Sequence, residues 1–333
     1  MELEAARLLS EHGLGGVTDP GAMTFGELLD RWLEAMAGEY RPNSLATHGN
    51  AVKAWKQTAA ANRRLSKLSR LDFTKARDAW VAGGFAPRTI SLRLTTVRVA
   101  LEEAVAWGWL GRNPATGVKS PAPRPARYAV WTEEQAARFL ALAEELDELR
   151  GGLFTLALLT GMRQGELIAL RWQDVDITDL HPQLRVEQAL REWRGGKLEF
   201  GPPKTAASAR TVALGSQAAA LLQRQRDRKT LRFRCELPEY VWDNGFGEPI
   251  KPRTLIHAFG KAVEAAGLPR IRMHDLRHTA ATLMRRAGVE VEEVAAALGH
   301  ADAATTHRIY SHVLPDRRRV AVEALDRALG GAS

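Results

Sequence analysis

Three alternating prolines divide this chain of 333 residues into two parts. They lie in the stretch VKSPAPRPARYAV, at Pro121, Pro123 and Pro125, between two regions with helical patterns. Alternating prolines favour an extended, semi-rigid connector, because each fixes its own φ and restricts the residue before it. Each part is long enough to bury a core of its own. We therefore expect a short leader, a helical domain, a proline-rich linker and a second domain, over residues 1–22, 23–118, 119–127 and 128–333.

The first domain has the spacing of apolar residues that is typical of helices. MTFGELLDRWLEAM begins with Thr24, and Glu27 follows three residues later, which predicts a capping box. Three further stretches repeat the pattern, and the last of them ends at Gly108 and Gly111. The sequence predicts four or five helices and no strand from 23 to 113.

The second domain combines helices with a short β region. GGLFTLALLTGMRQGELIALRW predicts an apolar helix, a glycine turn, and a second helix that contains Arg163 and Glu166. QLRVEQAL, KLEF and RTVAL predict three short strands, and Lys204 lies in the expected hairpin turn between the last two. Helices are predicted from there to the end. The fold class is mainly α with one small antiparallel sheet.

Positive charge is concentrated in the first domain. Residues 40–126 hold fifteen Lys and Arg against four Asp and Glu, a local excess of eleven, whereas residues 1–39 hold two against eight. Such an excess on a folded domain creates a field suited to the phosphate backbone of nucleic acids. The alternative is a solvated surface that only keeps the protein soluble.

Several protein classes are excluded by what the sequence lacks. The single cysteine, Cys235, excludes a disulfide framework and any multi-cysteine zinc site. No apolar run approaches the roughly 20 residues needed to span a bilayer, and the N-terminus lacks the features of a signal peptide. We expect an intracellular, cytoplasmic protein with no membrane association.

The stretch HDLRH places His274, Arg277 and His278 near one face of a helix. Apolar neighbours predict that this face is partly buried, so Arg277 needs an anion, either an internal carboxylate or a bound phosphate. The two histidines also have the i, i+4 spacing of HExxH zinc sites. Arg277 argues against a metal there, because a fixed cation beside a divalent metal is electrostatically costly.

Further polar residues extend this set. Arg163 follows a glycine turn, Lys204 lies in an exposed turn, His300 follows Gly299, and Tyr310 comes ten residues after His300. Such a collection of cations, histidines and one tyrosine suits phosphoryl transfer without a metal. Arginine and histidine donors stabilise the charge that develops on the phosphate, and a histidine or cationic cluster activates a tyrosine of ordinary pKa about 10. The 5′-oxygen of deoxyribose is a poor leaving group, so it requires a proton donor such as Lys204.

Taken in order, TGMRQGEL, HDLRH, LGH and THRIYSHV resemble the motifs of the tyrosine recombinase (phage integrase) family. The resemblance covers nearly the whole chain. It implies a two-domain clamp, with a helical, SAM-like core DNA-binding domain over 23–118 and a catalytic domain over 128–333. The implied catalytic residues are Arg163 and Arg277 on the phosphate, Lys204 on the leaving oxygen, His274 and His300 in proton transfer, and Tyr310 as the nucleophile, with Glu166 in support.

The resemblance also implies partners. Two protomers would grip each double-stranded core site, and a homo-tetramer would exchange strands through a Holliday junction and a 3′-phosphotyrosyl intermediate, without ATP or metal. Directionality or DNA-bending factors are possible partners, and the enzyme would be nucleoid-associated when bound. The 22 residues before MTFGELL are too few for the separate arm-binding domain of many integrases. The helix expected in DRRRVAVEALDRAL either docks on a neighbouring protomer or packs within its own chain.

The sequence alone leaves some assignments open. His278 is expected to pack in its helix, His307 and His312 to lie at the surface, and Glu166 to be either an orienting carboxylate or a surface residue. A type IB topoisomerase, a non-catalytic DNA-binding regulator and a zinc hydrolase are the alternative functions.

Overall fold

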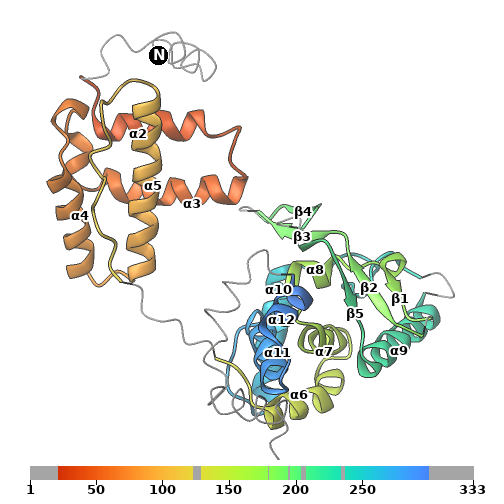
Figure 1. Ribbon diagram of the computed structural model, residues 1–333. Helices are drawn as coiled ribbons and strands as arrows, with labels where there is room; N and C mark the ends of the chain where they lie inside the picture. The colour runs from red at the N-terminus through yellow and green to blue at the C-terminus, as the bar shows by residue number, and fades with distance from the viewer. Residues whose placement is uncertain are drawn as a thin grey trace, which may run out of the picture. The chain divides into compact units, whose positions relative to one another are not determined.

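The computed structural model describes residues 22–122, 129–178, 180–193, 196–203, 208–233 and 237–299. The chain forms two compact units (Figure 1). Unit 1 comprises residues 1–126 with 193–195, and unit 2 comprises residues 127–192 with 196–333. No helix in the described part of the chain is both long and apolar enough to cross a membrane.

Unit 1 is helical, as its sequence predicts. Its four α-helices are α2 (Phe25–Ala35), α3 (Pro42–Lys56), α4 (Arg70–Ala82) and α5 (Pro87–Ala106), with 3-10 turns at Ala59–Asn62 and Leu65–Lys67. The predicted capping box is confirmed, since the Glu27 amide donates to the Thr24 hydroxyl at 3.3 Å and the Thr24 amide donates to Glu27 Oε2 at 2.8 Å. Residues 23–113 contain no strand beyond one isolated bridge.

The core of unit 1 is built on aromatic side chains. The Phe25 ring makes edge-to-face contacts with Trp55 and Phe73, at centroid distances of 5.8 and 5.5 Å. Trp55 in turn lies 4.7 Å from Trp80. These large buried rings bring α2, α3 and α4 together, and the long helix α5 packs against all three.

Unit 2 is organised around α7 (Gly151–Thr160), which is apolar on every side and buried along nearly its whole length. Helices α6, α9 and α11 contact α7, and α12 packs on α11 (Figure 1). Thr132 forms a second capping box at the start of α6. The other helices are α6 (Glu133–Leu146), α8 (Gln164–Ile168), α9 (Ser216–Arg232), α10 (Pro252–Ala265), α11 (Asp275–Arg286) and α12 (Val291–Leu298), with a 3-10 turn at Trp172–Asp174.

The short antiparallel strands are confirmed, but they form two sheets rather than one. One sheet has the order β1–β2–β5 and the other is the pair β3–β4. QLRVEQAL divides between them, since β2 ends at Val186 and β3 begins at Ala189. Between the two strands, the Gln188 side chain donates to the Ala169 carbonyl at 3.0 Å. The strands are β1 (Val175–Asp176), β2 (Gln183–Val186), β3 (Ala189–Glu192), β4 (Leu198–Gly201) and β5 (Arg210–Ala213).

Gly165 in α8 should not tolerate alanine. A Cβ at this position would lie 2.5 Å from the Leu190 carbonyl oxygen, so α8 or β3 would have to move. We expect Gly165→Ala to lower the free energy of unfolding by about 1–3 kcal/mol, as overpacking commonly does. Gly260→Ala in α10 is the matched control, because its Cβ would meet nothing within 4 Å. That variant should gain up to about 1 kcal/mol from helix propensity. Equal urea midpoints for the two variants would contradict the tight α8–β3 contact.

Candidate active site

A tight turn between α7 and α8 sets the position of Arg163. Gly161 ends α7 with φ +63°, a left-handed conformation that favours glycine. A Cβ there would also lie 2.4 Å from the Leu298 side chain, so the turn is packed directly against α12. Two residues later, Arg163 is the N-cap of α8. The sequence prediction of a glycine turn followed by a short helix is confirmed, with Arg163 at the helix boundary.

Glu166 lies one turn into α8 and holds Arg163 in place. Its Oε1 accepts from Arg163 Nη1 at 2.8 Å, and its Oε2 accepts from the Arg163 amide at 3.0 Å. The Glu166 side chain is only 2% exposed, so the surface alternative for this residue is wrong. Burial alone would raise the pKa of Glu166, but the charge of Arg210 and the hydrogen bonds from Arg163 outweigh it and hold the pKa below its ordinary value.

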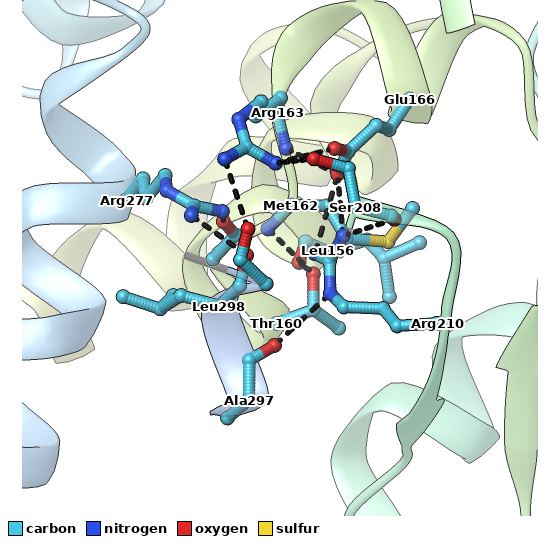
Figure 2. A network of polar contacts seen from close by, with 12 residues as sticks. Leu156, Thr160, Met162, Arg163, Glu166, Ser208, Arg210, Arg277, Ala297 and Leu298 are labelled. Atoms are coloured by element: carbon cyan, nitrogen blue, oxygen red, sulfur yellow. Dashed lines mark hydrogen bonds and ion pairs between the residues drawn. The ribbon is translucent and has the colours of Figure 1, made fainter. Parts of the chain in front are cut away.

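Three arginines bind three consecutive carbonyl groups at the end of α12 (Figure 2). Arg210 Nε donates to the Ala297 oxygen at 3.2 Å, Arg277 Nη2 to the Leu298 oxygen at 2.6 Å, and Arg163 Nη2 to the Gly299 oxygen at 3.1 Å. The last carbonyls of a helix lack partners within the helix and attract cations. The arginine cluster, Arg163, Arg210 and Arg277, therefore fixes the point at which the chain leaves α12.

Arg277 is the most enclosed member of this cluster. It projects from α11, is 3% exposed, and donates Nη1 to the Gly161 oxygen at 2.7 Å. Together with its bond to Leu298, this ties the α7–α8 turn to the end of α12. The predicted burial of Arg277 is confirmed. Because its guanidinium is anchored by two carbonyls from separate segments, its orientation is fixed before any ligand arrives.

His274 and His278 mark the first turn of α11. Their rings meet edge to face at 5.3 Å, His274 as the exposed N-cap and His278 as a buried residue. Partial removal from water, followed by the charge of Arg277, lowers the pKa of His274. Burial lowers the pKa of His278 to about 4, and the neighbouring His274 contributes. The expected packing role of His278 is consistent with this burial. No group of three or more possible metal ligands occurs in the described ranges.

The structure brings Arg163, Glu166 and Arg277 together, with His274 one turn before Arg277 on α11. The remaining predicted residues lie outside the described residues: Lys204, His300, Tyr310, His307, His312 and the expected C-terminal helix. Strands β4 and β5, on either side of the segment that contains Lys204, do not pair with each other as the expected hairpin requires. Strand β4 pairs with β3 and strand β5 pairs with β2, so this segment connects two sheets.

The arginine cluster, Glu166, Ser208 and the last carbonyls of α12 form one polar network (Figure 2). Two of its residues, Arg210 and Ser208, are not predicted from the sequence. Arg210 opens β5, and its Nη1 and Nη2 both donate to Glu166 Oε2 at 3.2 Å. Ser208 is buried, and its hydroxyl accepts from Arg163 Nη1 at 3.2 Å. In the sequence, Arg210 resembles any arginine at the start of a short strand. Only its spatial partner, 44 residues away in the chain, distinguishes it.

Acid should destabilise unit 2 through His278. Because the pKa of His278 falls from 6.5 to about 4 on folding, the unfolded chain binds the proton more readily than the folded one. The stability that the neutral His278 contributes to the folded state is complete above pH 6.5. As the pH falls towards 4, the free energy of unfolding decreases by up to about 3 kcal/mol through this residue.

Urea unfolding between about pH 7 and about pH 4.5 measures this loss. His278→Gln should show a shallower decline in the free energy of unfolding than the unsubstituted protein. His257→Gln, which removes an exposed imidazole from α10, controls for the loss of a histidine as such. If the slopes of H278Q and the unsubstituted protein coincide, His278 is not the group responsible.

Comparisons with known proteins identify the family of the chain. The model of the phage integrase family matches residues 129–317. A XerC-like tyrosine recombinase of Caldanaerobacter subterraneus subsp. tengcongensis is 28% identical over 324 residues, which cover 91% of this chain and 83% of the relative.

Solved structures of integrases have a similar fold. The Tn1549 transposon integrase in complex with transposon right end DNA has a TM-score of 0.78 at 19% identity, over 91% of this chain and 99% of that one. A lambda integrase tetramer bound to a Holliday junction has a TM-score of 0.65 at 18% identity, over 94% and 86%. Since the family model covers more than half of the sequence, the chain belongs to the phage integrase family of tyrosine recombinases, enzymes that cut and rejoin DNA.

Proposed function

We propose that this protein is a site-specific recombinase that cuts one DNA strand by attack of Tyr310 on a phosphodiester and later rejoins it to a new partner. One observation carries the proposal. Arg163 and Arg277, which come from different helices, bind the consecutive carbonyls of Leu298 and Gly299 at the end of α12. His300 follows directly, and Tyr310 comes ten residues after His300. This arrangement supports a phosphate site at the point where the nucleophile's segment begins.

The two guanidiniums suit the charge that forms during cleavage. A phosphodiester carries one negative charge, and roughly a second gathers on its non-bridging oxygens as the nucleophile attacks. The Arg163 side chain is 32% exposed, and Glu166 and Gly299 hold its guanidinium in place. Arg277 is held more tightly. Donors fixed in advance stabilise the transition state without reorganisation when the charge appears.

Proton transfers complete the proposed step. The Tyr310 oxygen forms a bond to phosphorus as the bond to the 5′-oxygen breaks, and Lys204 gives that oxygen its proton. The phenol proton passes to a histidine, His274 or His300; the lowered pKa of His274 favours the neutral form, which can accept it. In the rejoining step, a 5′-hydroxyl attacks the phosphotyrosyl phosphorus, and the same bond changes and proton transfers occur in reverse. The phosphotyrosyl bond retains the energy of the broken bond, so the reaction uses neither ATP nor metal.

The likeness to integrases of a transposon and of phage lambda supports integration or excision of a mobile element as the biological role. Residues 23–118 would bind double-stranded core sites through their excess of positive charge, and residues 128–333 would carry out catalysis. Four copies would assemble on two sites, as in the lambda tetramer on a Holliday junction. Directionality or DNA-bending factors would act on this assembly, in the cytoplasm and at the nucleoid.

Covalent capture from random DNA tests the proposal, because it requires no defined target sequence. The protein is incubated with duplexes that contain a randomised central segment, with EDTA and without ATP, and DNA that survives a denaturing wash is sequenced. We expect recovery of a shared sequence motif joined to protein at a 3′-phosphate. No covalent DNA under any condition would contradict the proposal. Plasmids with one or two copies of the motif then separate recombination, which requires two copies, from topoisomerase-like relaxation, which requires one.

A further inference from the structure

Arg210 is buried in the network, although nothing in the proposed reaction uses it directly. Its side chain is 8% exposed. Besides its two hydrogen bonds to Glu166 Oε2, Arg210 donates from Nη1 to the main-chain carbonyl oxygen of Ser208 at 3.1 Å. Its Nε donates to the main-chain carbonyl oxygen of Ala297 at 3.2 Å. A Cβ on Gly299 would lie 2.7 Å from Arg210 Cδ, so the end of α12 leaves space for this arginine. A side chain with this many fixed partners has a defined position.

The charges of the network depend on Arg210. Glu166 is a buried carboxylate, and with Arg163 alone it would form a neutral pair. Arg163 and Arg210 together carry two positive charges against the one negative charge of Glu166, so these three side chains have a net charge of +1. Since the Arg210 side chain is 8% exposed and the Arg163 side chain 32%, the surplus positive charge faces solvent at Arg163, where a phosphate would bind.

We propose that Arg210 is a positioning residue for DNA cleavage, which neutralises Glu166 so that Arg163 keeps its charge for the scissile phosphate, and which holds the last turn of α12 in register with β5. The inference rests on the proposed function. Glu166 is needed to orient Arg163, but a carboxylate beside the phosphate would repel it. Arg210 offsets that repulsion from the buried side. Its guanidinium also spans Glu166 and the Ala297 carbonyl at once, which suits arginine better than lysine.

The test compares variants of Arg210 on two substrates. Arg210→Met removes the charge and keeps much of the length, and Arg210→Lys keeps the charge with fewer hydrogen bonds. Arg185→Met is the matched control, since Arg185 is an exposed arginine on the neighbouring strand β2, where it pairs with Thr211 of β5. Each variant reacts with a captured DNA site that has either an ordinary scissile phosphate or a neutral methylphosphonate, and the rate of covalent adduct formation is measured.

On the ordinary phosphate we expect R210M to react roughly 10–100-fold more slowly than the unsubstituted protein, as the loss of charged hydrogen-bond partners would cause. R210K should recover most of that loss, and R185M should show none. On the methylphosphonate the R210M defect should shrink to within about fivefold, because the substrate no longer carries the charge that Arg163 has to meet.

The outcomes separate this inference from the proposed function. Equal defects of R210M on both substrates would reduce Arg210 to a structural role and overturn the inference, and so would an R210M rate equal to that of R185M. The proposed function would stand in both cases, because the unsubstituted protein forms the adduct. Failure of the unsubstituted protein to form any adduct would overturn both. If R210M does not fold, as judged by circular dichroism, the substrate comparison is made with Arg210→Gln, which also removes the charge but keeps hydrogen-bond donors, and its defect should likewise be confined to the charged phosphate.

Discussion

Tyr310→Phe should abolish the covalent protein–DNA adduct and leave DNA binding intact. The substitution removes one hydroxyl oxygen and keeps the ring, so the fold and the DNA contacts should persist. In a covalent mechanism, loss of the nucleophile removes nearly all of the catalysed rate, and we expect a drop of at least about 10⁴-fold. A nicked DNA site that traps the intermediate, followed by a denaturing gel, measures the adduct, and a mobility shift measures binding.

Tyr240→Phe is the control for this experiment. Tyr240 stacks on Phe200 at 5.2 Å, and its hydroxyl has no part in the proposed chemistry. This variant should form the adduct at the unsubstituted rate. An adduct of normal yield with Y310F would show that another residue attacks the phosphate, and the assignment of the nucleophile would be lost.

Arg163→Ala and Arg277→Ala should each cost about 3–4 kcal/mol of transition-state stabilisation, by analogy with the loss of one oxyanion donor. This corresponds to a roughly 10²–10³-fold slower cleavage step. Single-turnover adduct formation at saturating DNA separates this loss from weaker binding. The exposed Arg253 on α10 provides the control, since Arg253→Ala removes an equal charge from a side chain that is not part of the arginine cluster.

The two variants should differ in stability. Arg277 is buried and joins the Gly161 and Leu298 carbonyls, so its removal leaves two acceptors unsatisfied and loosens the turn against α12. Arg163 is more exposed, so R163A should melt closer to the unsubstituted protein. A folded R277A or R163A that cleaves at the unsubstituted rate would exclude that arginine from the phosphate site.

Local signals predict the helical parts of this fold well. The capping boxes at Thr24 and Thr132 and the left-handed Gly161 are each determined by a few neighbouring residues, and all three are present in the structure. The burial of Arg277 and His278 also follows from helix periodicity, because apolar residues flank them on α11. These features depend on contacts within one or two turns of chain, which sequence spacing describes directly.

Pairings between distant segments are not determined by such spacing. The division of 183–190 into two strands follows from their different partners, β5 for β2 and β4 for β3, and the sequence offers no sign of those pairings. The same holds for Arg210, whose role depends on Glu166 and the end of α12. The family resemblance implies which residues act on the substrate, but it gives no reason to select a strand arginine that would act through another side chain.

The most direct test of the central claim is a structure of the protein on a captured DNA site with vanadate in place of the scissile phosphate, since vanadate adopts the five-coordinate geometry of the transition state. We predict the Tyr310 oxygen as one apical ligand, with the Arg163 and Arg277 guanidiniums on equatorial oxygens and Lys204 beside the opposite apical oxygen. A structure in which the Tyr310 hydroxyl is packed away from the vanadium, or in which neither guanidinium reaches its oxygens, would contradict the account.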